Sequence, residues 1–248
     1  MTDLIIGALL SVTVAGIATL RGSLSRSGFV TSLGLGTFVY TFAGVGIFGA
    51  LMLFFISSSL LAKLHPNRKK SRRNGWQVLA NGGVLLLLTC LSFVWHSDAP
   101  SILMLTSIGV AMSDTWASEI GQKSRALPFH VLTKKPFPPG LSGGVSVLGY
   151  MAAFLAALLI GAVSFFILDS PSISLALWIS LFSFFGAWVD SVLGLIQVKY
   201  RTVSGHLSET YEKDSLIAQG CVWLDNNRVN FLSNVITVCV FGLFLWLF

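Results

Sequence analysis

The chain has 248 residues, of which 54% are hydrophobic and only 10% are charged, and its formal net charge is +6. Soluble domains carry roughly 25% charged residues, so this composition, with a mean hydropathy of +0.80, excludes an ordinary soluble protein and indicates a membrane protein. No nucleic-acid-binding motif accompanies the positive charge, so we expect no nucleic-acid partner. The three cysteines have the spacing of neither a zinc site nor a disulfide framework, and we interpret them as packing residues.

Long apolar segments recur along the chain and are separated by polar or glycine-containing stretches. A transmembrane helix needs about 20 mainly apolar residues. We therefore predict an all-α fold, a polytopic transmembrane helical bundle with short loops, in which residues 1–248 form a single integral membrane domain. The first segment has no basic residues before it and no signal-peptidase motif after it, so we expect it to be retained. The predicted spans, about eight in number, are residues 3–20, 28–41, 44–62, 75–95, 101–119, 143–168, 173–197 and 230–248.

The second and third of these spans are the ambiguous part of the prediction, because only glycines interrupt residues 28–62. Two spans, one long helix, or a short re-entrant second segment fit the hydropathy. Charge favours two spans: all 16 Lys and Arg residues then lie near the odd-numbered loops. Short positively charged loops stay in the cytoplasm. We therefore predict cytoplasmic odd-numbered loops and both termini outside, in the cell membrane if the source is bacterial.

A basic run from His65 to Arg73 follows the third predicted span. Such runs commonly fix topology and contact anionic lipid head groups. Arg73 is retained as a candidate for phosphate binding.

Carboxylates within or next to the later spans need an explanation, because an Asp at the centre of a transmembrane helix costs about 2.5–3.5 kcal/mol. Asp114 and Glu119 lie near the end of the span at 101–119, and Asp190 lies inside the span at 173–197. Asp114 and Glu119 are about 140° apart around an ideal helix. They converge on one ligand only if the helix unwinds or the ligand lies across its end.

Polar side chains also recur at helical spacing, which places each set on one helix face. Interhelical hydrogen bonding is the simpler interpretation of any single asparagine. These sets, however, occur in the same part of the chain as the carboxylates. The sets are Asp190, Gly194 and Gln197; Asn74, Gln77 and Asn81; and Asn227, Asn230 and Asn234.

A loop rich in proline and glycine, residues 133–146, precedes the sixth predicted span. Gly140, Gly143 and Gly144 permit close approach of the backbone, and the helix that follows offers unpaired N–H groups. Lys134 and Lys135 add positive charge, so the loop is a candidate phosphate site. A tight turn between helices is the alternative, because the stretch is not a Walker loop.

Carboxylates and amide oxygens are hard ligands of the kind that Mg²⁺ takes, and Mg²⁺ commonly bridges protein carboxylates to substrate phosphates. Direct contact between a carboxylate and a phosphate is repulsive. We therefore expect Mg²⁺ in this region, with Asp114, Glu119 and Asp190 as its ligands.

Five segments of the chain together resemble the signature segments of the integral membrane family called domain of unknown function 92, which includes plant phytyl-phosphate kinase and animal transmembrane protein 19. The resemblance implies an enzyme that phosphorylates an isoprenoid monophosphate to the diphosphate with CTP or another nucleoside triphosphate. The segments are Arg73-Asn-Gly-Trp-Gln-Val-Leu-Ala-Asn-Gly-Gly83, Ser113-Asp-Thr-Trp-Ala-Ser-Glu-Ile-Gly121, Pro138-Pro-Gly-Leu-Ser-Gly-Gly-Val-Ser146, Asp190-Ser-Val-Leu-Gly194 and Asn230-Phe-Leu-Ser-Asn234.

We accordingly predict a prenyl monophosphate kinase in which Asp114, Glu119 and Asp190 are catalytic and the phosphate-binding residues surround them. A lipid-phosphate transporter or flippase and a non-catalytic scaffold are the alternatives. His130 is interpreted as a loop residue, because the acceptor is already an anion and a general base matters less. The expected partners are an isoprenoid lipid phosphate, a nucleotide and membrane lipid. The predicted phosphate-binding residues are Arg73, Asn81, Lys134, Lys135, Gly140, Ser142, Gly143, Gly144, Gln197, Arg228, Asn230 and Asn234.

Overall fold

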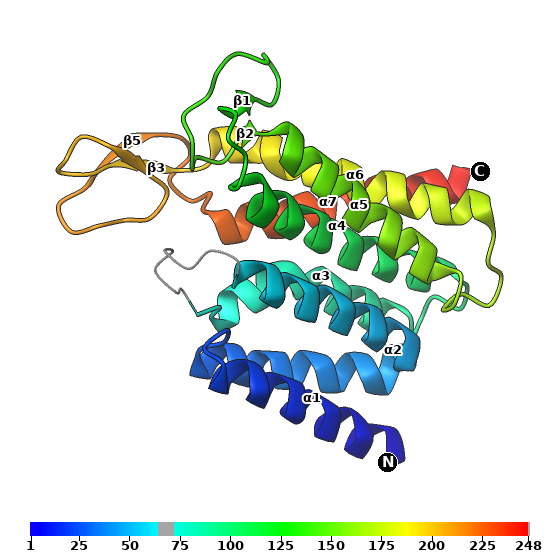
Figure 1. Ribbon diagram of the computed structural model, residues 1–248. Helices are drawn as coiled ribbons and strands as arrows, with labels where there is room; N and C mark the ends of the chain where they lie inside the picture. Colours follow the sequence, from blue (N-terminus) through cyan, green and yellow to red (C-terminus); the bar gives the residue numbers. More distant parts are fainter. Residues whose placement is uncertain (64–71, 248) are drawn as a thin grey trace.

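The computed structural model describes residues 1–63 and 72–247, and this part of the chain is a bundle of helices with two small sheets at one end (Figure 1). The basic run predicted at residues 65–73 lies outside the described residues except for Arg72 and Arg73. The helices are α1 (Thr2–Leu20), α2 (Arg26–Ala62), α3 (Gly75–Leu91), α4 (Ala99–Gly121), α5 (Val147–Ser164), α6 (Ile173–Ile196) and α7 (Asn226–Leu247).

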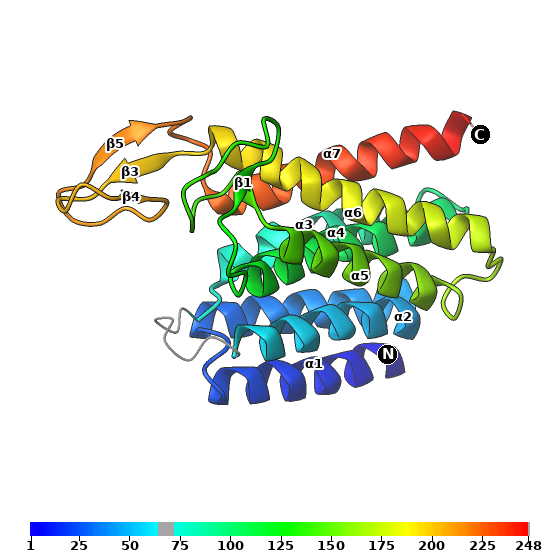
Figure 2. The ribbon, with the colours of Figure 1, turned by 45° about the horizontal axis from the view of Figure 1, so that its top comes forward.

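Helix α2 is two helical arms joined at Gly44, whose φ of 84° and ψ of 171° are not helical. A Cβ added to Gly36 would lie 3.5 Å from the ring of Phe48, although 12 residues of straight helix span about 18 Å. The rings of Tyr40 and Phe48 likewise meet edge to face, with centroids 5.3 Å apart. Residues 26–43 and 45–62 therefore fold back on each other, side by side (Figure 2). The predicted interruption of residues 28–62 is present, and it lies at Gly44.

Side-chain caps begin several of the helices. The hydroxyl groups of Ser25, Ser146 and Ser172 accept hydrogen bonds from the backbone three residues further on, at the starts of α2, α5 and α6. Asn74 and Gln77 form a reciprocal capping box at the start of α3. Each cap satisfies a backbone donor that the helix leaves unpaired, which stabilises a helix by about 1 kcal/mol.

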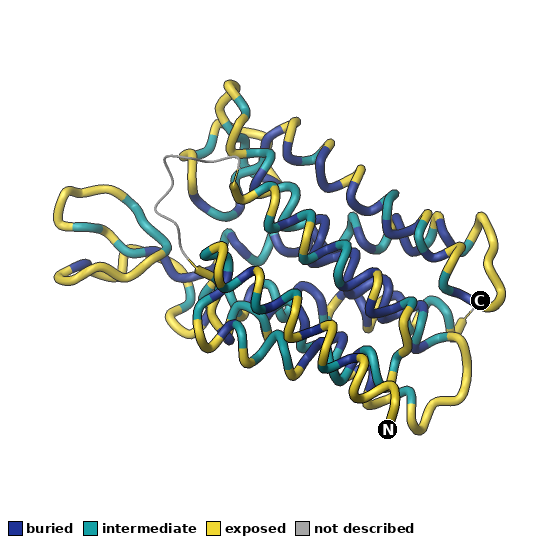
Figure 3. The backbone as a smooth tube through the Cα atoms, turned by 60° about the horizontal axis from the view of Figure 1, so that its bottom comes forward, coloured by how far each residue is buried: buried dark blue, intermediate teal, exposed yellow. Residues whose placement is uncertain are grey.

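Helix α4 lies at the centre of the bundle and is buried along residues 102–113 (Figure 3). The rings of Phe182 and Phe241 stack at 4.2 Å between α6 and α7. The outward faces of the peripheral helices are also apolar, with Leu9, Leu177 and Leu243 each more than half exposed. An apolar exterior around a packed interior is typical of a protein in lipid.

Five of the described helices, α1, α2, α5, α6 and α7, are long and apolar enough to cross a membrane by length and composition. Helix α3 is apolar but has only 17 residues. The structure thus supports a membrane domain with several spans, and these criteria do not establish eight.

Two small sheets add β-structure to the predicted all-α fold. One pairs β1 (Phe129–His130) with β2 (Gly144–Val145), and the other has the order β4-β3-β5, with β3 at Lys199–Arg201, β4 at Leu207–Ser208 and β5 at Leu216–Gln219. All pairings are antiparallel. Strands of two to four residues are too short to show an alternating hydrophobic pattern. The predicted span 143–168 accordingly begins later, at Val147.

The two ends of the bundle differ in charge. Both sheets and the segments 21–25, 72–74, 122–146 and 197–225 lie at one end, and both termini lie at the other (Figure 1). Every described Lys and Arg residue falls in or near these segments, except Lys63, which caps the C-terminal end of α2. The connections at the other end carry Asp98 and Asp169.

Candidate functional site

A cavity of about 640 Å³ opens at the sheet end, between α3, α4, α6, α7 and the loop that precedes α5. Ten of the predicted site residues line it, although they come from segments far apart in the sequence. These residues are Arg73, Asn81, Asp114, Glu119, Gly140, Ser142, Gly143, Gly144, Asp190 and Asn230.

Asp114 of α4 and Asp190 of α6 form the inner wall of this cavity. Their carboxyl groups lie within hydrogen-bonding reach of each other. The Ser233 hydroxyl donates to Oδ2 of Asp190 at 3.0 Å. The Asn230 amide nitrogen, in the orientation that satisfies its neighbours, also donates to this oxygen at 3.2 Å. Two facing carboxyl groups repel when both are ionised, so the pair needs a shared proton or a cation.

Helix α4 continues unbroken to Gly121, and Asp114 and Glu119 both line the cavity. The unwound helix, one of the two arrangements that the sequence allows, is therefore absent, and a ligand across the helix end stays a prediction. Glu119 is 8% exposed, and Asp114 is half-buried.

The proline- and glycine-rich loop closes one side of the cavity and already holds a carboxylate. The backbone N–H of Ser142 donates to Oε1 of Glu209, and the Ser142 hydroxyl donates to Oε2 at 2.9 Å. Gln197 Nε2 donates to the same hydroxyl at 3.3 Å. The loop thus binds an anionic group through a backbone N–H and a hydroxyl, which are the kinds of donor that anion sites use.

The loop packs directly on the end of α6. A Cβ added to Gly194 would meet Cβ of Ser142 at 2.7 Å and the backbone nitrogen of Gly143 at 3.1 Å. Only a residue without a side chain permits this approach. Because Gly194 follows Asp190 by about one turn, the contact fixes the loop relative to the carboxylate pair.

Lys199 binds the C-terminal end of α6, where the loop packs. Its side chain is only 1% exposed, and its Nζ donates to the carbonyl oxygens of Gly194 and Leu195 at 3.2 and 3.3 Å. Lys199 thus satisfies hydrogen-bond acceptors at the C-terminal end of α6, and its positive charge interacts favourably with the negative end of the helix dipole. Burial lowers the pKa of Lys199 from its ordinary value, and the carboxylate of Glu209 opposes this shift.

Two guanidinium groups and four carboxylates line the cavity. The cations are Arg73 and Arg125, and the carboxylates are those of Asp114, Glu119, Asp190 and Glu209. The Arg73 backbone is fixed by hydrogen bonds with Ser23 and Ser25 at the start of α2. Since carboxylates outnumber cations, an anionic ligand would need an added cation to bind here.

The described residues contain no group of three or more His, Cys, Asp or Glu side chains that could hold a metal ion. One or two carboxylates suffice for Mg²⁺ when substrate phosphates supply further ligands. The facing pair of Asp114 and Asp190 fits that requirement.

Five predicted phosphate-binding residues lie outside the lining of this cavity. Lys134 is exposed, with its Nζ 5.1 Å from the Phe129 ring centroid, and Lys135 is exposed beside it. Arg228 donates to the carbonyl oxygen of Trp223. Asn234 lies deeper in the bundle and donates to the carbonyl oxygen of Ser107 at 3.1 Å. Gln197 reaches the site only through Ser142.

Sequence reasoning missed Arg125, Lys199, Glu209 and Ser233, all of which line or support the cavity. In the sequence, Arg125 and Lys199 are only members of the basic clusters that were predicted to be cytoplasmic. Glu209 lies in an irregular segment with no helical spacing to connect it with Asp190. Ser233 is next to Asn234 in the sequence but is not a member of the asparagine set at helical spacing, so that pattern did not predict it.

Comparison with known proteins is consistent with a membrane protein. A family model described as an integral membrane protein family, DUF92, matches residues 9–238. Protein PGR of Arabidopsis thaliana is 30% identical, in a match that covers 94% of this chain and 93% of that protein. An uncharacterized membrane protein of Methanocaldococcus jannaschii is 31% identical over 56% of this chain and 60% of its own length. An uncharacterized membrane protein of Synechocystis is 25% identical over 79% of this chain. No solved structure matches.

Proposed function

The chain belongs to the DUF92 family of integral membrane proteins, and on that premise we propose that it is a membrane-embedded phosphotransferase. The terminal phosphoryl group of a nucleoside triphosphate, with CTP favoured, is transferred to an isoprenoid monophosphate. The bond from the γ-phosphorus to the oxygen bridging the β- and γ-phosphates breaks, that oxygen leaves with the nucleoside diphosphate, and a bond from the γ-phosphorus to an oxygen of the acceptor phosphate forms. The products are the isoprenoid diphosphate and the nucleoside diphosphate.

The observation that carries this proposal is the polar cavity, where facing carboxylates, two arginines and an anion-binding loop meet at one end of an apolar bundle. Phosphoryl transfer depends mainly on positioning and on stabilising negative charge. When bound, Mg²⁺ would be held by Asp114 and Asp190 and would neutralise the nucleotide phosphates. A cavity between membrane and water suits a lipid acceptor and a soluble donor.

The other residues of the cavity have distinct proposed roles. Arg73 and Arg125 bind phosphate oxygens, for which the planar guanidinium group is well matched. The backbone N–H and hydroxyl of Ser142, which bind the carboxylate of Glu209 in the structure, would donate to a phosphate that takes its place. Asn230 and Ser233 hold Asp190 in place through the hydrogen bonds described above. The acceptor oxygen is already negatively charged, so no general base is required.

We further propose that the chain crosses the membrane eight times, with the arms of α2 counted separately and the sheet end in the cytoplasm. The support is the charge asymmetry between the two ends, since positively charged segments stay inside. Both termini are then outside. This orientation places the cavity on the side where nucleotides are abundant.

Cysteine labelling tests this orientation. Ser170, between α5 and α6, and Ser204, between β3 and β4, are both exposed and lie at opposite ends of the bundle. In a chain whose native cysteines are replaced by serine, a membrane-impermeant maleimide should label Ser170→Cys in intact cells. It should label Ser204→Cys only after lysis. The reverse pattern would place the cavity outside.

The direct test of the proposed activity uses the purified protein with CTP or ATP and a panel of prenyl monophosphates. We expect the matching prenyl diphosphate, detected by mass spectrometry, in the presence of Mg²⁺. Excess EDTA should abolish its formation, and added Mg²⁺ should restore it, because the carboxylates would otherwise repel the nucleotide. No turnover with any pair, at saturating Mg²⁺, would refute the proposal.

A lipid-phosphate or ion-coupled transporter is the second candidate, favoured by the facing carboxylates inside the helices and by the break in α2. Intramembrane carboxylates and interrupted helices are common in carriers. Movement of a labelled prenyl phosphate across liposomes without nucleotide would support this function. If the protein is a kinase, the labelled prenyl phosphate should not cross the liposome membrane.

A further inference from the structure

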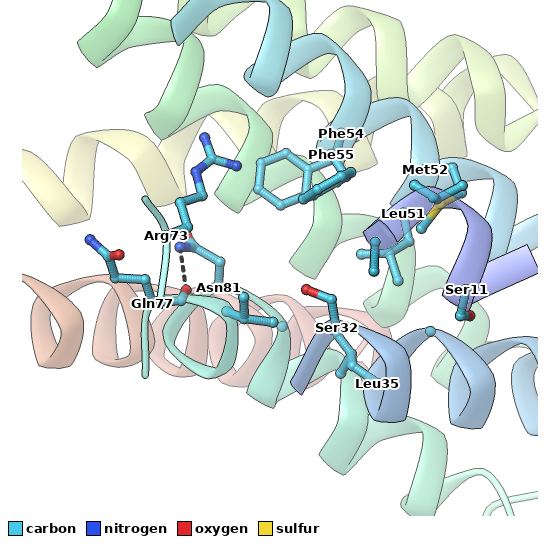
Figure 4. Close-up of a pocket in the computed structure, with 15 residues that line it drawn as sticks. Ser11, Ser32, Leu35, Leu51, Met52, Phe54, Phe55, Arg73, Gln77 and Asn81 are labelled. Carbon is cyan, nitrogen blue, oxygen red and sulfur yellow. Dashed lines mark hydrogen bonds between the residues drawn. The ribbon is translucent and has the colours of Figure 1, made fainter. Parts of the chain in front are cut away.

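A second, smaller cavity of about 60 Å³ lies between α1, both arms of α2 and α3 (Figure 4). Its walls are mainly apolar. Leu51, Phe54 and Phe55 come from the second arm of α2, Leu35 comes from the first arm, and Val78 comes from α3. Nothing in the proposed phosphotransfer uses these residues.

The apolar cavity adjoins the polar one. Arg73, Gln77 and Asn81 line both, and Figure 4 shows these three side chains together at one end, with Leu51 and Met52 towards the other. The Asn81 amide nitrogen donates to the carbonyl oxygen of Gln77 at 3.0 Å, which holds this boundary in place. Polar and apolar sites therefore meet at one row of side chains on α3.

An amphipathic ligand is the one kind of molecule that fits both cavities at once. Its charged head needs the arginines and hydrogen-bond donors of the polar cavity, and its hydrocarbon part gains free energy by leaving water. The second cavity has limited volume, so it admits the part of the chain nearest the head group. Ser32 lies on its wall, opposite Phe55.

We infer that this apolar cavity binds the first isoprenoid units of the lipid phosphate whose head group lies in the polar cavity, with Arg73 at the junction. The inference rests on the proposed function, and it assigns the tail to the α1–α2–α3 side of the bundle. Residues at this wall, Ser32 among them, then determine which chains are accepted.

Photolabelling of the wild-type protein tests the location of the tail. A geranylgeranyl monophosphate analogue with a photoreactive group near the phosphate is bound with Mg²⁺ and without nucleotide, and the adduct is mapped by mass spectrometry. Adducts in α1 or α2, which line the apolar cavity but not the polar one, are expected. Adducts confined to α3, α4, α5, α6 and α7 would overturn the inference.

A pair of substitutions on α2 tests the role of the cavity wall. Ser32→Phe should fill the cavity and weaken binding of geranylgeranyl monophosphate by at least about tenfold, as expected when methylene groups lose their buried site. Gly34→Phe adds the same ring where nothing lies within 4 Å of a new Cβ, so it should bind as wild type does. Equal binding by a folded Ser32→Phe variant would contradict the inference.

The measurements separate this inference from the proposed function, because neither uses nucleotide. Labelling in α1 or α2 without any phosphotransfer would refute the kinase and retain the lipid site. Phosphotransfer with labelling elsewhere would do the opposite. Should Ser32→Phe fail to fold, the wild-type photolabelling decides the outcome.

Discussion

Replacing Asp190 with asparagine should lower kcat for phosphoryl transfer by at least about a hundredfold, and Asp114→Asn should do the same. Each substitution keeps the shape of the side chain and removes one of the two facing negative charges. Removing one group that stabilises charge in a transition state commonly costs 10²- to 10³-fold. The measurement is kcat with saturating prenyl monophosphate, nucleotide and Mg²⁺, together with the Mg²⁺ concentration at half-maximal rate, which should rise.

The fold should survive the Asp190 substitution, because an asparagine oxygen can still accept the hydrogen bond that Ser233 donates. Asp169→Asn is the matched control. Asp169 is exposed at the opposite end of the bundle, between α5 and α6, and its substitution should leave kcat unchanged. Wild-type activity in both Asp114→Asn and Asp190→Asn would exclude this pair from the catalytic site.

The sequence predicted the members of the carboxylate pair better than it predicted their geometry. The cost of burying Asp114 and Asp190 in apolar helices singles both out without any structure. The two residues face each other because α4 packs against α6. Helical spacing within one segment does not show which helices pack together. Glu119 lines the same cavity although α4 does not unwind there, and its role as a metal ligand stays a prediction.

The cationic side of the site was harder to predict for a physical reason. Lys and Arg residues at one end of a membrane bundle commonly fix topology, so their presence at the sheet end does not identify which ones face the cavity. Arg73 and Arg125 line it, whereas Lys134 and Lys135 lie on the outside of the loop. Lys199 is buried where the sheet meets α6, and no local sequence pattern predicts that contact.

The break in α2 illustrates the opposite case. Six glycines in residues 28–62 made several interruptions possible, and hydropathy did not choose among them. Two spans in this segment place all the Lys and Arg residues on one side of the membrane, so the charge distribution favoured a chain that reverses direction here. The structure places that return at Gly44, the one residue of α2 with non-helical φ and ψ, and the left-handed φ there explains why glycine is required.

Gly194→Ala should reduce kcat by about a hundredfold although it adds a single methyl group. The new Cβ would meet Cβ of Ser142 at 2.7 Å and the backbone nitrogen of Gly143 at 3.1 Å. Backbone atoms cannot move aside as the end of a flexible side chain can, so the loop must shift away from α6. A displacement of about 1 Å near reacting groups can cost a hundredfold. Trypsin should also cleave after Lys134 faster than in the wild-type protein, since the loop is no longer held.

Gly49→Ala provides the matched control for this substitution. Gly49 also lies within a helix, and nothing lies within 4 Å of a Cβ added there. In both variants alanine favours the helix by up to about 1 kcal/mol relative to glycine, so neither should lose helical structure through propensity. Gly49→Ala should keep wild-type kcat and wild-type cleavage. If Gly194→Ala behaved in the same way, contact of the loop with α6 would not be what positions Ser142 beside Asp190, and the anion-binding role of the loop would lose its structural basis.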